Sequence, residues 1–293
     1  DTFFERKWLF GFVITESNNH GEFTEYILSS TRYGEHQYLD LLNRVLNTGD
    51  VRTGRNGGTI SLFNNHMTFD LRNGFPLLTT KRMFIRGIIE ELLFFLRGDT
   101  DTKILEKNGV KIWSGNTSRE FLDNLGMNTR PEGCMGPMYG YQWRHFDAEY
   151  DEKTQQPLES GIDQLAYVIG TIKNDPNSRR IIMTTFNPRQ VDDGVLYPCH
   201  SIVTQFYVQN QEIDMFCYNR SQDLFLGVPF NIASSALLLI LVSKLTGKTP
   251  RFLYFTLGDT HIYSSHIGQV RTQLTRIPYK FPEIIVPDVK NMD

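Results

Sequence analysis

IASSALLLILVSKL, residues 232–245, is the longest apolar run in the chain, and it decides the fold. The run is too short to span the hydrocarbon core of a bilayer, which needs about 20 apolar residues. It therefore predicts a long buried helix. No charged n-region followed by an apolar segment opens the sequence, so no targeting segment is expected.

The segments around this helix define the fold class. Helical spacing of apolar residues predicts helices over residues 36–49, 84–98 and 161–176. Alternating or β-branched runs predict strands at 59–71, 201–210, 212–219, 251–263 and 282–289, with a hairpin turn at QNQE, 209–212. Helices and hairpins are mixed instead of alternating as βαβ units, which indicates an α+β fold with a mixed, largely antiparallel sheet.

Composition limits the class of protein. A formal net charge of −3, from 30 basic and 33 acidic residues, favours neither nucleic acid nor an anionic membrane surface as a partner. Cys134, Cys199 and Cys217 are widely spaced without a CxxC pair, which argues against a disulfide framework and for a reducing, cytoplasmic location. Residues 1–33 predict a hairpin, either an N-terminal extension or a junction with another domain, and residues 34–293 form the main domain.

Cys199 lies in VLYPCHS, residues 195–201, and has three possible roles. A buried structural thiol is the commonest role of a lone cysteine. Zinc would need further ligands at set spacings, yet His200 is adjacent, His261 and His266 are distant, and no HExxH occurs. We therefore expect no metal. The third role, a nucleophile, requires groups that stabilise the thiolate.

Four arginines lie in polar, turn-like contexts: Arg52, Arg179, Arg180 and Arg220. Each alone fits a solvated surface, but together they suit a phosphate monoester, whose oxygens pair with guanidinium groups. The same cations are expected to lower the pKa of a neighbouring thiol and to keep part of Cys199 as thiolate. Glu91, inside IIEELLFFL, lies either on a solvated helix face or, if buried, carries protons with a raised pKa.

Six motifs together resemble the thymidylate synthase family, from about His36 to the C-terminal end: NGFPLLTTKR (73–82), GPMYGYQWRHF (136–146), DPNSRRII (175–182), YPCHS (197–201), NRSQDLFLGVPFNIAS (219–234) and GDTHIYSSH (258–266). The resemblance implies the thymidylate synthase fold in a homodimer. It also implies reductive methylation of dUMP to dTMP by 5,10-methylenetetrahydrofolate, which leaves as dihydrofolate, without a metal. Some members are fused to a dihydrofolate reductase, so residues 1–33 could be part of such a junction.

The same resemblance implies a role for each site residue. The catalytic set is Cys199, Glu91, Tyr139, Asn231, Arg220, Asp223 and His200, in which the Cys199 thiolate adds to the uracil ring and Glu91 and Tyr139 relay protons. Asn231 matches uracil N3–H and O4. The substrate-binding set adds Arg52, Asn219, Ser221, His261 and Tyr263, with Arg179 and Arg180 donated by the other subunit. Asp223 also belongs to the folate set, with Ile112, Trp113, Asn116, Leu226, Gly227 and Phe230.

Several features depart from the family pattern. Asn219 replaces a glutamine, Phe186 a tryptophan, Ser235 a tyrosine, and Ser114 and Cys134 aspartates, which affects folate contacts more than the chemistry. Family members continue beyond VPDVKNMD, 286–293, into a mobile C-terminal tail that we expect to be absent here. Two alternative functions stay open: a nucleotide hydroxymethylase of the same family, in which water replaces the hydride, and a non-catalytic nucleotide-binding relative.

Overall fold

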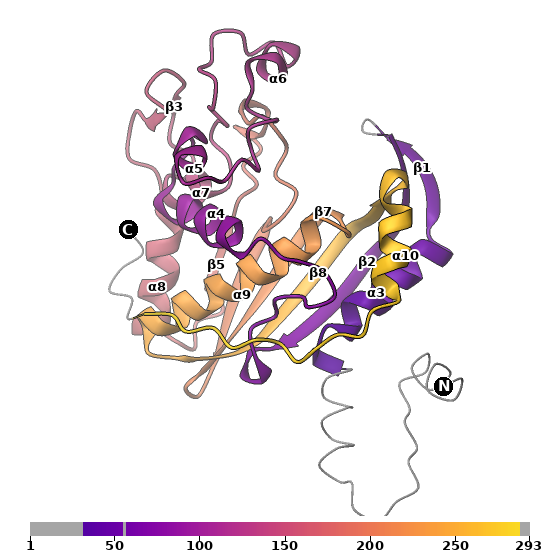
Figure 1. Ribbon diagram of the computed structural model, residues 1–293. Helices are drawn as coiled ribbons and strands as arrows, with labels where there is room; N and C mark the ends of the chain where they lie inside the picture. The colour runs from indigo at the N-terminus through magenta and orange to yellow at the C-terminus, as the bar shows by residue number, and fades with distance from the viewer. Residues whose placement is uncertain (1–31, 55–56, 288–293) are drawn as a thin grey trace, which may run out of the picture.

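A mixed sheet is the centre of the fold. The computed structural model describes residues 32–54 and 57–287 (Figure 1), so almost all of the hairpin predicted for residues 1–33 lies outside the described residues. The strand order is β1-β2-β8-β7-β6-β5. Neighbouring strands are antiparallel except β7 and β8, which are parallel. The predicted α+β class with a mixed, largely antiparallel sheet is therefore confirmed.

The bounds of the elements follow. The main sheet contains β1 (Asp50–Gly54), β2 (Gly57–Asp70), β5 (Ile182–Thr184), β6 (Val203–Gln209), β7 (Glu212–Asp223) and β8 (Thr249–Tyr263), and a small ribbon contains β3 (Tyr150–Asp151) and β4 (Gln156–Pro157). The helices are α3 (His36–Thr48), α4 (Ile85–Arg97), α5 (Lys103–Lys107), α6 (Arg119–Asn124), α7 (Gly140–Arg144), α8 (Gln164–Asn174), α9 (Gly227–Thr246) and α10 (Ile267–Leu274). Short 3-10 turns are η1 (Leu71–Asn73), η2 (Val191–Asp193) and η3 (Ser264–His266).

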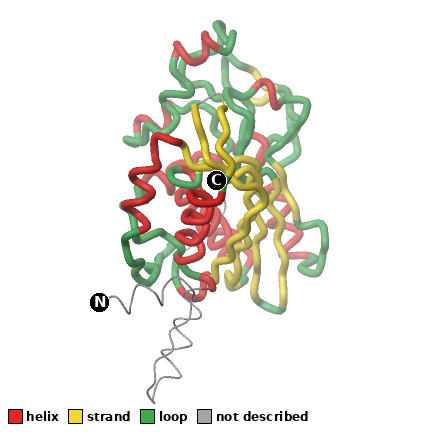
Figure 2. The backbone as a smooth tube through the Cα atoms, turned by 90° about the vertical axis from the view of Figure 1, so that its right-hand side faces the viewer, coloured by secondary structure: helices red, strands yellow, loops and turns green. Residues whose placement is uncertain are grey.

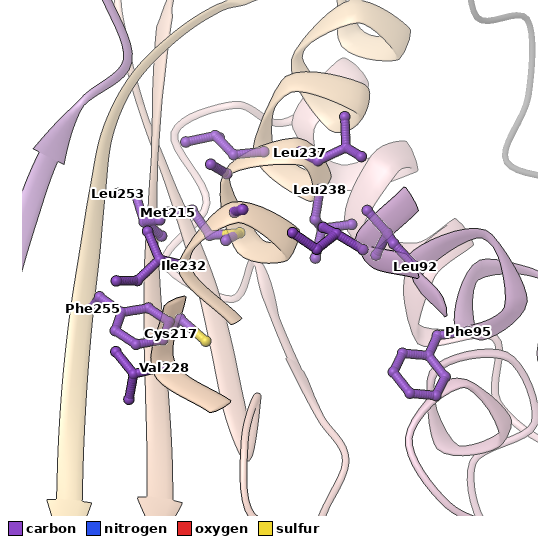
Figure 3. Close-up of a cluster of buried hydrophobic side chains, with 14 of the residues drawn as sticks. Leu92, Phe95, Met215, Cys217, Val228, Ile232, Leu237, Leu238, Leu253 and Phe255 are labelled. Atoms are coloured by element: carbon purple, nitrogen blue, oxygen red, sulfur yellow. The ribbon is translucent and has the colours of Figure 1, made fainter. Parts of the chain in front are cut away.

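Helix α9 is the buried helix that the apolar run predicts. It is 20 residues long because residues 227–231 extend it at the N-terminus, so length and composition alone would allow it to cross a membrane. Within the protein it is largely buried, with its side chains packed between the sheet and α4 (Figure 3). Among the described residues it is the one helix of this kind, and its burial identifies it as a core helix.

Side chains from the sheet and two helices form the core beside the site. Met215 and Cys217 of β7 and Leu253 and Phe255 of β8 meet Val228, Ile232, Leu237 and Leu238 of α9, and Leu92 and Phe95 of α4 lie on the far side (Figure 3). Each fully buried apolar side chain contributes about 1.5–3 kcal/mol. This packing holds α9, including Val228 of its first turn, against the middle of β7 and β8.

Both helices that reach the site end at a glycine in the left-handed region. Gly98 follows α4 with φ +75° and its N–H bonds to the carbonyls of Phe94 and Phe95. Gly247 follows α9 with φ +66°. Glycine adopts this conformation without the steric cost that a Cβ would bring, so each helix ends sharply.

Within the part of the chain that the structure describes, one face of the sheet has no covering helices. Most helices lie on the opposite side (Figure 2), and β6 alternates buried Phe206 and Val208 with exposed Gln205, Tyr207 and Gln209. Tyr254 and Ile182 are also exposed, at 39% and 44%. This bare face, defined by Ile182, Gln205, Tyr207 and Tyr254, presents aromatic and aliphatic side chains to the outside.

Three local predictions are wrong. The described part of the predicted closing strand, residues 282–287, forms no strand, and instead Pro282 accepts a hydrogen bond from the Phe75 N–H at 2.7 Å. The run at residues 59–71, whose alternation predicts paired strands, is instead a single strand over residues 59–70, within β2, which pairs with both β1 and β8, and Leu71 begins η1. Arg220 lies on β7 and Arg52 on β1, not in turns, because strand pairing extends each ladder through polar sequence.

Candidate active site

Cys199 lies in the loop that leads into β6, against the buried phenol of Tyr139. The Tyr139 hydroxyl is 3.3 Å from the Cys199 sulfur and accepts a hydrogen bond from the Cys199 N–H at 3.2 Å. Both sides of this contact have backbone in the left-handed region, with φ +43° at Tyr139 and +52° at Ser201. Such strain persists only where the surroundings enforce it, and it is concentrated at functional sites.

The surroundings of Cys199 favour the neutral thiol in the isolated chain. Burial raises its pKa, and Glu91 adds to this, while the Tyr139 hydrogen bond and the Arg220 guanidinium lower it. The balance is a raised pKa, which corrects our expectation of a thiolate held by clustered arginines. The reason is that Arg220 is the one arginine among the causes, and its guanidinium is engaged by the carbonyl of Pro198 at 3.2 Å.

Glu91 is buried in the protein, not on a solvated face of α4. Its carboxylate accepts a hydrogen bond from the Trp113 indole, with Nε1 2.8 Å from Oε1. Burial raises the pKa of Glu91 to about 7, against the smaller opposing effect of the Trp113 bond. A carboxyl group that titrates near neutral pH is well suited to accept and return protons.

His200 forms the other wall beside Tyr139. The two rings stack at 4.3 Å between centroids and 16° between planes. Burial lowers the pKa of His200 to about 4, so the imidazole is neutral near pH 7. It therefore supports the site by packing and as a neutral hydrogen-bonding group.

The opposite side of the Cys199 loop meets the end of β7 and the first turn of α9. The Cys199 carbonyl accepts from the Ser221 N–H at 3.2 Å and from the Gln222 side-chain amide at 3.3 Å. Gln222 in turn accepts a hydrogen bond from the Asn231 amide, with Nδ2 2.8 Å from Oε1. Asp223 accepts from the N–H groups of Phe225 and Leu226, which fixes the turn into α9.

Strand register brings the predicted sugar and phosphate residues together. Thr59 of β2 pairs with Arg52 on one side and with Tyr263 on the other. His261 is the register partner of Asp223, and its Nδ1 lies 2.8 Å from Asp259 Oδ1. The Tyr263 ring meets the His261 ring edge-on at 5.1 Å, and Arg52 is exposed with an ion pair to Asp259 at 3.6 Å. Arg52 is thus available to a ligand.

Comparison with known proteins identifies the family. A family model described as thymidylate synthase matches residues 36–293. The chain belongs to the thymidylate synthase family. It is 49% identical over 263 residues to thymidylate synthase from Homo sapiens, covering 89% of this chain and 84% of the human protein. Thymidylate synthase 1/2 from Encephalitozoon cuniculi is 48% identical, with 87% of each chain covered.

Other relatives are longer. The bifunctional dihydrofolate reductase-thymidylate synthase of Leishmania amazonensis is 49% identical over 86% of this chain, which spans only 49% of that protein. The matched part contains the Cys199 site. The chain is therefore a methyltransferase of the thymidylate synthase type, which forms dTMP from dUMP with methylenetetrahydrofolate as co-substrate.

Three residues of the predicted substrate-binding set, Arg179, Arg180 and Asn219, do not face Cys199 as ligand-binding side chains within one chain. Arg180 precedes β5, which pairs with β6 from Thr184 opposite Val203 to Ile182 opposite Gln205. The Ile181 carbonyl accepts from the Phe206 N–H in the middle of β6, so Arg180 lies farther still from the Cys199 loop, which leads into the start of β6. Arg179 lies beside it in sequence, so neither arginine joins Cys199 within one chain. Asn219 is fully buried, and its amide bonds to the N–H of Ser201 and the carbonyl of Thr256.

The predicted substrate-binding role of Asn219 stays a prediction. Each end of its amide bonds to backbone, which gives Asn219 a role in supporting the site. Because its Oδ1 accepts from the Ser201 N–H at 3.0 Å, it stabilises the loop that carries Cys199. Glutamine, longer by one methylene, would have more reach than asparagine at this position.

The predicted folate residues lie in the loop that contains Trp113, at the end of β7 and at the start of α9. Leu226 and Ile112 are exposed at 52% and 40%. Phe230 on α9 lies beside Gly87 on α4, where a Cβ would be 3.2 Å from the ring. Asn116 donates its N–H to the carbonyl of Trp113, and Gly227 begins α9. The structure brings these residues to neighbouring elements around the buried Glu91.

Lys81 is a site residue that the sequence analysis missed. Its ammonium lies 3.8 Å from the centre of the Phe225 ring and donates to the Phe225 carbonyl at 2.6 Å. Burial lowers the pKa of Lys81 to about 8. The motif NGFPLLTTKR was the available signal, but nothing in local sequence shows that Lys81 meets the Asp223–Phe225 turn.

The remaining departures from the family pattern are accommodated within the protein. Ser114 donates to Glu106 at 2.7 Å, and the Cys134 sulfur lies 3.2 Å from the Tyr150 hydroxyl. Ser235 lies 3.9 Å from the buried Cys217 sulfur. Phe186 is half-buried. Within residues 32–54 and 57–287, no group of three His, Cys, Asp or Glu side chains is arranged to hold a metal ion.

Proposed function

We propose that this chain methylates dUMP by covalent catalysis, with Cys199 as the nucleophile. The observation that carries the proposal is the contact between the Cys199 sulfur and the Tyr139 hydroxyl at 3.3 Å, beside the buried Glu91. A thiol, a phenol and a carboxyl group that titrates near neutral pH together provide a nucleophile and a route for protons.

The proposed reaction begins with the Cys199 thiolate. Its sulfur bonds to C6 of uracil, and the electron pair of the ring double bond makes C5 a nucleophile as an enolate. C5 then bonds to the methylene carbon of the folate, as the bond from that carbon to one of its two folate nitrogens breaks. Loss of the C5 proton to the site and departure of tetrahydrofolate leave an exocyclic methylene, which takes a hydride from tetrahydrofolate to give dihydrofolate and a methyl group. The C6–sulfur bond breaks to release dTMP and the thiolate.

The thiolate must form when the substrate arrives, because burial raises the pKa of Cys199 in the isolated chain. The side chains of Tyr139 and Arg220 already favour the anion. Further guanidinium groups brought by a partner chain would lower the thiol pKa in the same direction. The Cys199 thiolate would therefore form only when the nucleotide and the partner chain are both in place, so that the nucleophile is generated as the substrate binds.

We propose that the active form is a homodimer. The bare sheet face carries exposed Ile182, Tyr207 and Tyr254, and an uncovered face of this kind on a globular domain favours a protein contact. Arg179 and Arg180 are exposed and lie on the side of β5 and β6 that is remote from Cys199 in the same chain. A second copy packed through this face would supply these arginines to the phosphate, with Arg52, Arg220 and Ser221 from the first copy.

The wider context of the enzyme follows from two observations. Cys134, Cys199 and Cys217 are all free thiols, which supports a reducing, cytoplasmic location. Bifunctional relatives carry a reductase in the same polypeptide, according to their names. We propose that residues 1–33 are an extension or junction outside the catalytic domain, with a fused dihydrofolate reductase as one possible neighbour.

The decisive experiment uses 5-fluoro-dUMP with methylenetetrahydrofolate. Fluorine cannot leave as a cation, so the adduct should stay attached to Cys199 and be located there by mass spectrometry. The Cys199→Ser variant should form no adduct and lose at least about 10³-fold in activity. With dUMP, release of dihydrofolate supports the synthase, whereas tetrahydrofolate would indicate the hydroxymethylase. Binding without turnover or adduct would indicate the non-catalytic relative.

A further inference from the structure

Gln222 links the nucleophile to the amide that reads the base. It lies near the end of β7 and is 1% exposed. Its Nε2 donates to the Cys199 carbonyl at 3.3 Å, and its Oε1 accepts from Asn231 Nδ2 at 2.8 Å. One buried amide therefore bridges the Cys199 loop and the first turn of α9.

The direction of both hydrogen bonds is set by chemistry. A backbone carbonyl can only accept, so the nitrogen end of Gln222 must face Cys199. The oxygen end then faces Asn231, where only Nδ2 can donate. The Cys199 carbonyl is itself held by the Ser221 N–H at 3.2 Å. The Cys199 carbonyl thus fixes the orientation of the Gln222 amide, and the Gln222 amide fixes the orientation of the Asn231 amide.

We propose that Gln222 determines pyrimidine specificity by fixing this orientation of Asn231; the inference rests on the proposed function. With one N–H of Asn231 bonded to Gln222, the other N–H and Oδ1 remain for the base. They match uracil, which offers an acceptor at O4 and a donor at N3. Cytosine offers the reverse, a donor at its 4-amino group and an acceptor at N3, so it would need Asn231 turned over.

Gln222 opposes a rotation of the Asn231 side-chain amide that would exchange its oxygen and nitrogen. The rotated amide would place Oδ1 against Gln222 Oε1, and two acceptors cannot bond to each other. Because Gln222 is almost fully buried, water is poorly placed to relieve the conflict. Gln222 cannot turn in response without placing its own oxygen against the Cys199 carbonyl. Gln222 is therefore a positioning residue, which acts on the base through Asn231.

The test compares binding of dUMP and dCMP by calorimetry in the full chain and in Gln222→Met. Methionine has a similar length but no hydrogen-bonding amide, so Asn231 is free to present either orientation. We expect the preference for dUMP over dCMP to fall about tenfold, which corresponds to about 1.4 kcal/mol. A merely structural role would weaken both nucleotides equally and leave this ratio unchanged, and that result would overturn the proposal.

Two further variants serve as a control and as a second test of Gln222. Gln142→Met removes an equally buried amide, also 1% exposed, that bonds to the Pro137 carbonyl and the Gln190 side chain, and it should leave the ratio unchanged. Gln222→Asn shortens the side chain by one methylene, withdraws the acceptor from Asn231, and should lower the ratio like methionine. If Gln222→Met does not fold, the asparagine variant decides.

A double variant separates this proposal from the proposed function. In an Asn231→Ala background, Gln222→Met should no longer change the dUMP to dCMP ratio, and a continued change would contradict action through Asn231. Failure of the proposed function has a different signature: the unmodified chain would form no covalent adduct with 5-fluoro-dUMP and methylenetetrahydrofolate. If the unmodified chain forms the adduct but Gln222→Met leaves the ratio of dUMP to dCMP binding unchanged, only the specificity proposal is wrong.

Discussion

The Trp113 indole donates a hydrogen bond to the Glu91 carboxylate, with Nε1 2.8 Å from Oε1 in the buried interior between α4 and the Trp113 loop. Two opposing effects meet in this contact. Burial favours the neutral acid, whereas the indole N–H favours the carboxylate. The balance puts the pKa of Glu91 at about 7, where both protonation states are populated during turnover.

Trp113→Phe should therefore raise the pKa of Glu91 above about 7, because the ring remains but the donor is lost. The limb of the pH profile of kcat that reports Glu91 should move to higher pH. Trp143→Phe is a suitable control, because the buried Trp143 N–H has no hydrogen-bond partner among the described residues. Identical profiles for Trp113→Phe and the unmodified enzyme would argue against Glu91 as the titrating group.

Glu91→Gln should change how stability depends on pH. The folded pKa of about 7 lies above the ordinary value of 4.5, so between them the folded state binds more protons than the unfolded state. The free energy of unfolding then falls as pH rises through this window. Glutamine removes this loss, worth up to about 3 kcal/mol above pH 7. Urea denaturation across the window checks it, and parallel curves for both proteins would contradict it.

Tyr139→Phe should make Cys199 less acidic. The phenol is the largest influence that lowers the pKa of this thiol, and phenylalanine keeps the ring that stacks on His200. The rate of alkylation by iodoacetamide, followed against pH, should shift to higher pH. Tyr141→Phe is the matched control, because that buried hydroxyl bonds to Ala148 and Glu149 carbonyls. If the Tyr139 variant reacts like the unmodified chain, the phenol does not stabilise the thiolate.

Glu35→Gln should destabilise the loop before Lys81. The Glu35 carboxylate is buried and accepts from the N–H and hydroxyl groups of both Thr79 and Thr80. An amide turns one acceptor oxygen into a donor that faces donors, so we expect a loss of about 2–3 kcal/mol in the free energy of unfolding. Glu120→Gln, on an exposed carboxylate of α6, should have almost no effect. Equal losses in the two variants would disprove the role of Glu35.

Arginine sharing predicts complementation between two inactive chains. In a mixed dimer of Cys199→Ser and Arg180→Ala, the intact Cys199 of one subunit receives the intact Arg180 of the other. Random reassortment makes half of the dimers mixed, each with one complete site, so the mixture should reach about a quarter of the unmodified activity. Activity no greater than the sum of the two separate variants would show that Arg180 acts within its own chain or not at all.

Helices and hairpins with strong local sequence patterns could be predicted from the sequence. The helices α3, α4 and α8 begin and end close to their predicted residues, because apolar periodicity and, for α3 and α4, a terminal glycine are local signals. The hairpin between β6 and β7 also formed as predicted, with Gln209 opposite Glu212. The strand predicted at residues 282–289 did not form over its described part, because an apolar run needs a pairing partner and Pro282 bonds to Phe75 instead.

By itself, the sequence determined the α+β class, the buried helix α9 and the motifs that identify the family and its reactive thiol. Only the tertiary structure decided the electrostatics of that thiol, the burial of Glu91, the engagement of Asn219 by backbone and the bridge from Cys199 through Gln222 to Asn231. The physical reason is distance along the chain. Periodicity and capping act over a few residues, whereas desolvation and hydrogen bonds such as Tyr139 to Cys199 depend on groups that strand register brings together from far apart.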